Sequence, residues 1–198
     1  MPDEYALILS AEESFARTVA IGVRVRRPVS AWHFLIPGMF LIDYMRMGGE
    51  IRAYSKLFLF PRKLALEAAQ DIRNGEDRQQ TTTRIEEETK EWLISLKRYS
   101  LRLHQEQMKS MNLFIDHYSR LLDAEGNSYY SLVRNAYGTR ENYQAYLGQL
   151  ASVEKELDRA IIEITGEADG VRERMQAEQA QVEELRKKEI NKIFGEEA

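Results

Sequence analysis

Apolar residues recur at intervals of three and four along most of this chain, which is the spacing of one face of an α-helix. One such pattern runs from Ile85 to Leu122, and a second runs from Thr139 to Ile164. In the second, the intervals of three and four alternate as in a heptad seam. Its seam positions are Tyr143, Tyr146, Leu150, Val153, Leu157, Ala160 and Ile164. We therefore expect two long antiparallel helices that pack seam to seam.

The first of these helices is predicted to span about forty residues, with a phase shift near Gln105–Lys109. Thr83 and Glu86 have the spacing of a capping box, which predicts where it begins. A short helix is expected at Tyr129–Tyr137. Beyond Gly170 only a thin apolar stripe continues through a charged sequence, which predicts a solvated final helix. This helix could face the basic N-terminal half or project and pair with another subunit.

The N-terminal part is punctuated by Pro28, Pro37 and Pro61. Ser10 and Glu13 form another capping box, so we expect a first helix from Ala11 to Val23. Because proline removes a backbone donor and clashes with the preceding turn, the following helices should break at Pro37 and at Pro61. A separate short helix is then predicted over residues 64–72, ending at a turn formed by Asn74 and Gly75.

These patterns predict an all-α protein. A bent N-terminal helical segment, residues 1–75, is followed by a long antiparallel helical hairpin with a charged C-terminal helix, residues 76–198. With 198 residues and 43% hydrophobic content, the two regions are expected to form one cooperative domain.

Val29–Met47 is the most apolar window of the chain. Its length is just adequate to cross a bilayer, but Pro37 interrupts it, and Asp43 and Arg46 would each cost roughly 2.5–3.5 kcal/mol in the hydrocarbon. A transmembrane helix is therefore disfavoured. The window is expected either to form the core of the domain or to lie against a membrane or partner.

Positive charge is concentrated around this window. Residues 24–63 carry eight Lys or Arg against two acidic residues, whereas the whole chain has a net charge of −4. Basic residues beside aromatic ones are typical of helices that lie at the edge of an anionic membrane. The expected membrane- or partner-binding residues are Arg24, Arg26, Arg27, Trp32, Phe34, Phe40, Arg62 and Lys63.

Composition narrows the function further. The absence of cysteine excludes disulfides, thiolate metal sites and cysteine nucleophiles. Asp3 and Glu4 stand where a signal peptide would be positive, so a cytoplasmic location, peripheral to a membrane through residues 24–63, is expected. Net acidity makes nucleic acid an unlikely partner, because such proteins need a basic face.

No catalytic signature is visible, and we expect neither a metal nor another cofactor. His104 and His117 are thirteen residues apart and lack the upstream Glu of helical-bundle metal sites. The preferred hypothesis is a non-enzymatic interaction or scaffold protein. Its partners would be an anionic lipid surface, another protein, or a second copy bound through the helical hairpin. The alternative is a helical-bundle ligand binder or enzyme, which would be distinguished by a closed cavity with converging polar groups.

Overall fold

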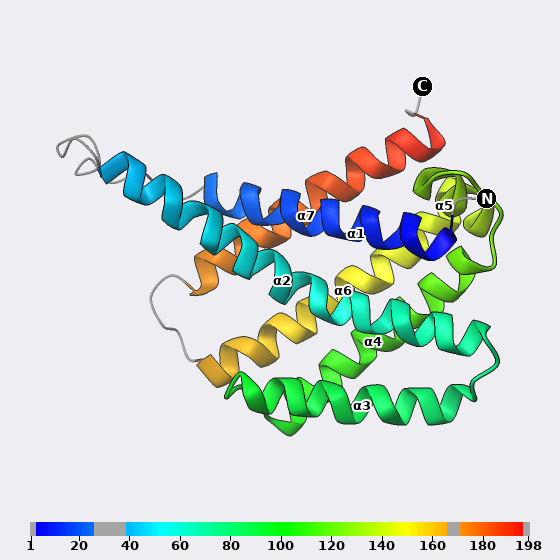
Figure 1. The fold of residues 1–198 in the computed structure, drawn as a ribbon, viewed down its shortest axis with the longest axis horizontal. Coiled ribbons are helices and arrows are strands. Elements are labelled where there is room, and N and C mark those ends of the chain that lie inside the picture. Colours follow the sequence, from blue (N-terminus) through cyan, green and yellow to red (C-terminus); the bar gives the residue numbers. More distant parts are fainter. Residues whose placement is uncertain (1–2, 26–38, 166–170, 196–198) are drawn as a thin grey trace.

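The computed structural model describes residues 3–25, 39–165 and 171–195, with the side chains of residues 3–23, 49–164 and 175–195. These residues form seven helices and no strand (Figure 1). The helices are α1 Glu4–Val25, α2 Met39–Arg73, α3 Arg78–Ser95, α4 Leu101–Leu122, α5 Tyr129–Tyr137, α6 Arg140–Thr165 and α7 Val171–Phe194. The prediction of an all-α protein is confirmed, and α5 has the predicted bounds.

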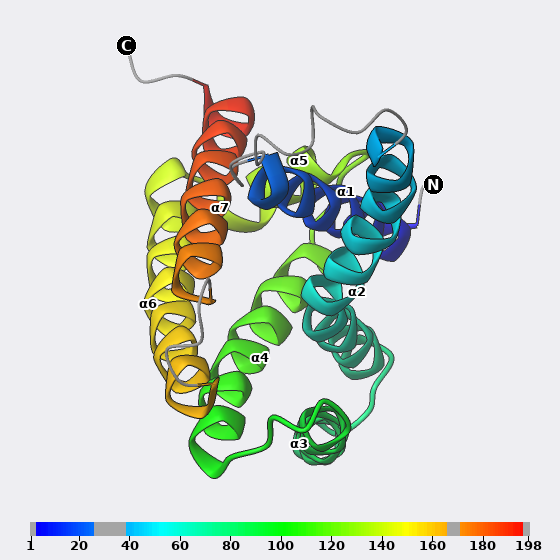
Figure 2. The same cartoon turned by 90° about the vertical axis from the view of Figure 1, so that its left-hand side faces the viewer.

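Two antiparallel helix pairs organise the bundle, α1 with α2 and α6 with α7, and α4 lies between them (Figure 2). Their direction follows from cross-contacts: Glu4 and Glu12 of α1 meet Arg73 and Arg62 of α2, respectively. The short α5 closes one end against α1, α4, α6 and α7, whereas α3 lies outside and contacts α2 and α4.

The main core draws on helices from both halves of the chain. Ile8 of α1, Leu66 of α2, Ile115 of α4, Leu150 of α6 and Ile193 of α7 are each no more than 2% exposed and belong to one cluster. Burying an aliphatic side chain of this size is worth roughly 1.5–3 kcal/mol. The N-terminal and C-terminal regions therefore stabilise each other.

The long helix expected over residues 85–122 is instead two helices, α3 and α4. At the end of α3, the amide of Lys97 donates to the carbonyl of Ile94, and the amide of Arg98 donates to the carbonyl of Leu93. This is a Schellman turn, which usually places glycine where Lys97 lies, at φ 55°. Ser100 then caps α4 by accepting a hydrogen bond from the amide of Leu103 at 3.1 Å. The prediction was wrong because no glycine marked the turn.

The α2 helix passes through Pro61, so the predicted break there and the separate helix over residues 64–72 are wrong. An interior proline costs about 3 kcal/mol. Directly after it, Leu64, Ala65 and Leu66 are all buried in the main core. Packing of this stretch therefore outweighs the missing backbone hydrogen bond.

Neither predicted capping box begins a helix. Ser10 lies inside α1, which already starts at Glu4. Thr83 lies inside α3, where its hydroxyl donates to the carbonyl of Gln79 at 3.0 Å. The residue that caps α3 is Asp77, which accepts from the amide of Gln80 at 2.9 Å. Capping patterns inside longer helices were thus mistaken for helix starts.

The charged helix α7 packs into the bundle and does not project from it. Val182, Ile190 and Ile193 are buried. At the crossing with α1, the side chain of Gln181 occupies the space beside Gly22 where a Cβ atom would lie. This close packing positions the polar side chains of α7 inside the molecule.

Candidate functional site

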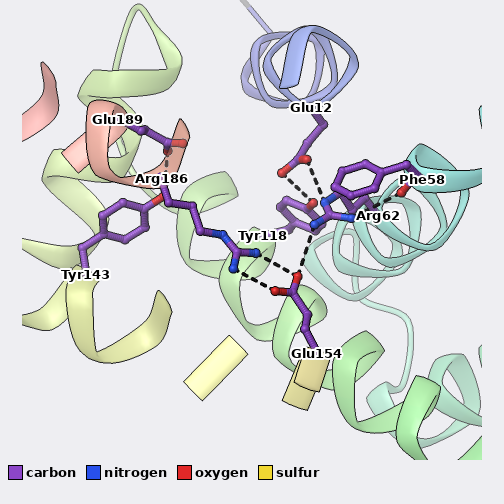
Figure 3. Close-up of polar contacts among 8 residues, drawn as sticks. All are labelled: Glu12, Phe58, Arg62, Tyr118, Tyr143, Glu154, Arg186 and Glu189. Carbon is purple, nitrogen blue, oxygen red and sulfur yellow. Dashed lines mark hydrogen bonds and ion pairs between the residues drawn. The ribbon is translucent and has the colours of Figure 1, made fainter. Parts of the chain in front are cut away.

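Four charged side chains, one buried and three partly buried, join four helices in the centre of the bundle (Figure 3). Arg62 of α2 lies 3.3 Å from a carboxylate oxygen of Glu12 in α1 and 3.5 Å from one of Glu154 in α6. Glu154 also accepts two hydrogen bonds from Arg186 of α7, both 2.8 Å long. We call Glu12, Arg62, Glu154 and Arg186 the ion ladder. Its two acidic and two basic groups make it neutral overall.

Two aromatic rings pack against Arg62, the residue that joins Glu12 to Glu154. The guanidinium carbon of Arg62 lies 3.9 Å from the ring centre of Phe58 and 4.7 Å from that of Phe114. Such cation–π contacts stabilise a desolvated cation by up to about 2 kcal/mol. One Arg62 nitrogen also donates to the carbonyl of Phe58 at 3.3 Å. The side chain of Arg62 is therefore fixed by both charge and packing.

Electrostatics keeps Arg186 charged in the interior. Burial disfavours its cationic form, but the carboxylate of Glu154 and the two hydrogen bonds to it hold the pKa of Arg186 above its usual range. The paired geometry matches a planar guanidinium to a carboxylate, which adds directional specificity. At the other end, the hydroxyl of Tyr118 in α4 donates to Glu12 at 2.8 Å. The network therefore reaches a fifth helix.

Glu189 of α7 is a further acid close to the ion ladder. Glu189 accepts a hydrogen bond from the hydroxyl of Tyr143 in α6 at 2.7 Å. Burial raises the pKa of Glu189, and the nearby charge of Glu12 adds to this, although the bond from Tyr143 opposes it. Burial likewise raises the pKa of Tyr143. This pair holds α6 and α7 together beside the ladder.

His117 forms part of a buried aromatic cluster. Its ring stacks on Tyr146 with 4.4 Å between ring centres, and its Nδ1 shares a 2.7 Å hydrogen bond with the hydroxyl of Tyr137. Burial, reinforced by the charges of Arg120 and other arginines, lowers the pKa of His117 to about 3. The imidazole is therefore neutral at physiological pH and serves the packing of α4, α5 and α6.

A first cavity of about 600 Å³ lies between α1, α6 and α7. Its wall combines Glu12 and Glu189 with Tyr143, Tyr146 and the apolar side chains of α1. A second cavity of about 830 Å³ lies between α2, α4, α6 and α7. The residues that line both cavities are Arg62, Phe114, Leu147 and Arg186. The basic half of the ion ladder thus separates two hollows in the bundle.

The second cavity contains two further acids. Asp158 of α6 accepts a hydrogen bond from the side-chain amide of Gln179, and Glu178 of α7 accepts one from the hydroxyl of Tyr54 in α2. Burial raises the pKa of Asp158 to about 6, and it also raises that of Glu178. The partner groups are neutral, so these carboxylates add negative charge to a neutral ladder.

The structure separates the site residues predicted from the sequence. Arg62 lies in the interior, 7% exposed, and not on the expected surface, because Glu12 and Glu154 compensate its charge there. Lys63, the next residue, is half exposed and lies 3.6 Å from Glu67. Arg26, Arg27, Trp32 and Phe34 lie outside the described residues, and Arg24 and Phe40 lie in helices without a described side chain.

The apolar window Val29–Met47 lies outside the described residues up to residue 38, and its remainder begins α2. In the part of the chain that the structure describes, no helix is both long enough and apolar enough to cross a bilayer. The same residues contain no group of three or more His, Asp or Glu arranged to hold a metal ion.

The sequence analysis missed the ion ladder, although its pattern carried a signal. In α6 the spacing of Leu147, Leu150, Glu154 and Leu157 puts a carboxylate at a heptad position. Arg186 similarly follows the buried Val182 by four residues on one face of α7. A charge on an apolar stripe indicates a buried pair, because an unpaired charge there would cost several kcal/mol.

Comparison with known proteins gives no match for this chain, whether to family models, to curated proteins or to solved structures.

Proposed function

We propose that this protein is a non-enzymatic binding protein that holds a small molecule inside its helical bundle. The observation that carries this proposal is the meeting of two cavities at a set of charges that hold one another in place. Small-molecule sites are typically hollows of about 300–1,000 Å³ with mostly apolar walls and a few fixed polar groups. Cavities of about 600 and 830 Å³ fall in this range.

The polar groups favour recognition over chemistry. Glu154 is held by Arg62 and Arg186, and Glu12 is held by Arg62 and Tyr118. Groups that hold one another in this way keep their positions without a ligand, and such preorganisation lowers the entropic cost of binding. They serve as a rigid wall against which a ligand can be oriented.

The proposal is tested by filling the second cavity. Gly148 of α6 lines it, and a Cβ atom there would meet no neighbouring atom within 4 Å. Gly148→Leu should therefore keep the fold and reduce the affinity for any ligand of this cavity at least tenfold. Ala145→Leu, at an exposed position of the same helix outside both cavities, is the control.

Binding is measured by calorimetry with a set of small amphiphilic compounds that carry cationic, neutral or anionic groups. Compounds that bind the native protein and the Ala145→Leu variant, but not the Gly148→Leu variant, support the proposal. If no compound binds at millimolar concentration, or if Gly148→Leu and Ala145→Leu bind equally well, the second cavity is not a ligand site.

As a second function, we propose a peripheral contact of residues 24–63 with an anionic membrane surface. This is supported by the solvent face of α2, where exposed basic side chains lie beside exposed apolar ones. The residues on this face are Arg52, Lys56, Leu57, Phe60 and Lys63. Each basic residue close to such a membrane contributes about 1 kcal/mol, which salt screens.

The membrane proposal is tested by co-flotation with vesicles that contain phosphatidylserine. Replacing Arg52, Lys56 and Lys63 together by Glu should abolish flotation, because it reverses three charges on one exposed face. The control replaces three exposed bases elsewhere, Arg98, Arg102 and Lys109, by Glu. Equal flotation of the two triple variants, or no flotation of the native protein at low salt, would rule out this surface.

A further inference from the structure

We propose that the second cavity accepts an organic cation with an apolar body, such as an aralkyl amine. This inference rests on the proposed ligand-binding function and names the chemical class of the ligand. It follows from the charges on the cavity wall, from their partners, and from the apolar surface around them.

Two acidic groups on the cavity wall favour a cation, because their hydrogen-bond partners are neutral. Arg62 and Arg186 are compensated within the ion ladder by Glu12 and Glu154. Asp158 and Glu178 come in addition to this neutral set, and their hydrogen-bond partners are the amide of Gln179 and the hydroxyl of Tyr54. Among the described residues, both carboxylates are hydrogen-bonded to neutral groups, and Arg62 offsets part of the charge of Glu178. Carboxylates held in this way still attract a positive group, and the attraction is stronger in a partly desolvated cavity than in water.

Burial supports the same conclusion. It raises the pKa of Asp158 to about 6 and raises that of Glu178, since removing water disfavours the charged carboxylate. The charge of Glu178 also raises the pKa of Asp158, and the charge of Glu154 raises the pKa of both acids. A bound ammonium group would offset these costs at neutral pH.

The rest of the cavity provides an apolar surface. It is formed by Phe58, Trp92, Phe114, Leu157, Ile161 and Val182. The Trp92 ring is itself fixed by stacking on Phe60, with 4.8 Å between ring centres. Aromatic rings near acidic groups suit the apolar body and the positive end of one molecule.

The other charges that line this cavity lie on its rim. Lys155, Lys187 and Glu183 are exposed. Water and salt screen their effect on a ligand placed inside. An anionic ligand would need Arg62 or Arg186, but both are engaged with Glu154. An anion would also face Asp158 and Glu178, so a cation is preferred.

The test uses three probes with the same apolar body: 4-phenylbutylamine, 4-phenylbutanol and 4-phenylbutyrate. Calorimetry at pH 7.5 should give at least a tenfold tighter binding of the amine than of the alcohol, and no binding of the carboxylate. Glu178→Gln and Asp158→Asn should each weaken amine binding about tenfold and leave alcohol binding unchanged. Both amides can still accept the hydrogen bonds of Tyr54 and Gln179, so the fold should be kept.

The control is Glu163→Gln, which removes an exposed carboxylate of the same helix that pairs with Arg102 outside the cavity. If the alcohol or the carboxylate binds as tightly as the amine, the cation assignment is wrong while the ligand-binding proposal stands. The cation assignment is also wrong, while the ligand-binding proposal stands, if Glu178→Gln and Asp158→Asn bind the amine as tightly as Glu163→Gln does. If none of the three probes binds the native protein, both the cation assignment and the second cavity as a site for ligands of this size are wrong.

Discussion

Arg62 illustrates how much of this protein depends on single interior residues. Its guanidinium contacts two phenylalanine rings and lies within 3.5 Å of carboxylates from α1 and α6. Removing one partner of a buried ion pair usually costs more than the pair itself contributes, because the other charge stays buried without compensation. The contribution of Arg62 is therefore best seen by comparison with its neighbour Lys63, which is half exposed.

We expect Arg62→Ala to lower the free energy of unfolding by about 3–5 kcal/mol, because Glu12 and Glu154 would lose a buried partner. Lys63→Ala should change it by no more than about 0.5 kcal/mol, because its pair with Glu67 is exposed to solvent. Urea unfolding monitored by circular dichroism measures both. Similar midpoints for the two variants would contradict a stabilising ladder.

Asp158 gives a prediction about pH. Its pKa is about 6 in the folded protein and about 3.9 in the unfolded chain, so the folded state binds the proton more tightly. The contribution of this group to stability is therefore complete below about pH 4 and is lost as the pH rises through 6. At pH 7.5, Asp158→Asn should be more stable than the native protein by about 1 kcal/mol, a value reduced for partial solvent exposure.

This gain should largely disappear at pH 4, where the carboxyl is protonated in the folded state and about half protonated in the unfolded state. His117 acts in the opposite direction, since its pKa of about 3 in the folded protein makes stability fall as the pH drops below 6.5. Because His117 is present in both proteins, its effect cancels in their difference. Thermal unfolding at several pH values provides the measurement, and an advantage of Asp158→Asn that does not depend on pH would argue against a buried charge.

At the level of the elements, the turn between α3 and α4 reverses the direction of the chain. Lys97 adopts φ 55°, a left-handed conformation that costs a non-glycine residue about 1–2 kcal/mol. The turn persists because it reverses the chain so that Leu93 and Leu103 both pack with Ala160 of α6. Tertiary packing thus holds a locally unfavourable backbone.

Lys97→Gly should raise the free energy of unfolding by about 0.5–1 kcal/mol, because glycine relieves the left-handed strain but adds freedom to the unfolded chain. The same substitution at Lys90, inside α3, should lower it by about 1 kcal/mol. Chemical unfolding of the two variants supplies the comparison. Destabilisation by both would mean that the turn carries no strain.

At the level of the whole molecule, the helices differ in how firmly they are held. In α4, eleven of 22 residues are buried, whereas α3 buries four of 18. Figure 2 shows α3 at the edge of the bundle, and it contacts α2 and α4. Helices with few buried residues open without unfolding the rest of a protein.

Hydrogen exchange should therefore separate these two helices. Amides in the middle of α4 should exchange only with global unfolding, while those of α3 should exchange through a local opening that costs at least about 2 kcal/mol less. Mass spectrometry of peptides from each helix measures the difference. Equal protection of α3 and α4 would show that the bundle opens as a single unit.

The sequence by itself determined the helical class of this protein, because apolar spacing of three and four residues is a local property of the chain. It located α5, α6 and α7 closely, since glycine and threonine mark their ends. It failed at Pro61 and Lys97, where local preference opposes the observed structure and packing against other helices outweighs it.

The candidate site was decided by the tertiary structure alone. Glu12, Arg62, Glu154 and Arg186 are far apart in the sequence, and each could have been a solvated surface charge. The positions of Glu154 and Arg186 on apolar helix faces indicated burial. Only the packing of α1, α2, α6 and α7 brings the four groups within pairing distance. The two cavities also depend on tertiary structure, because each is a space that side chains from several helices leave unfilled. No single segment of the sequence determines such a space.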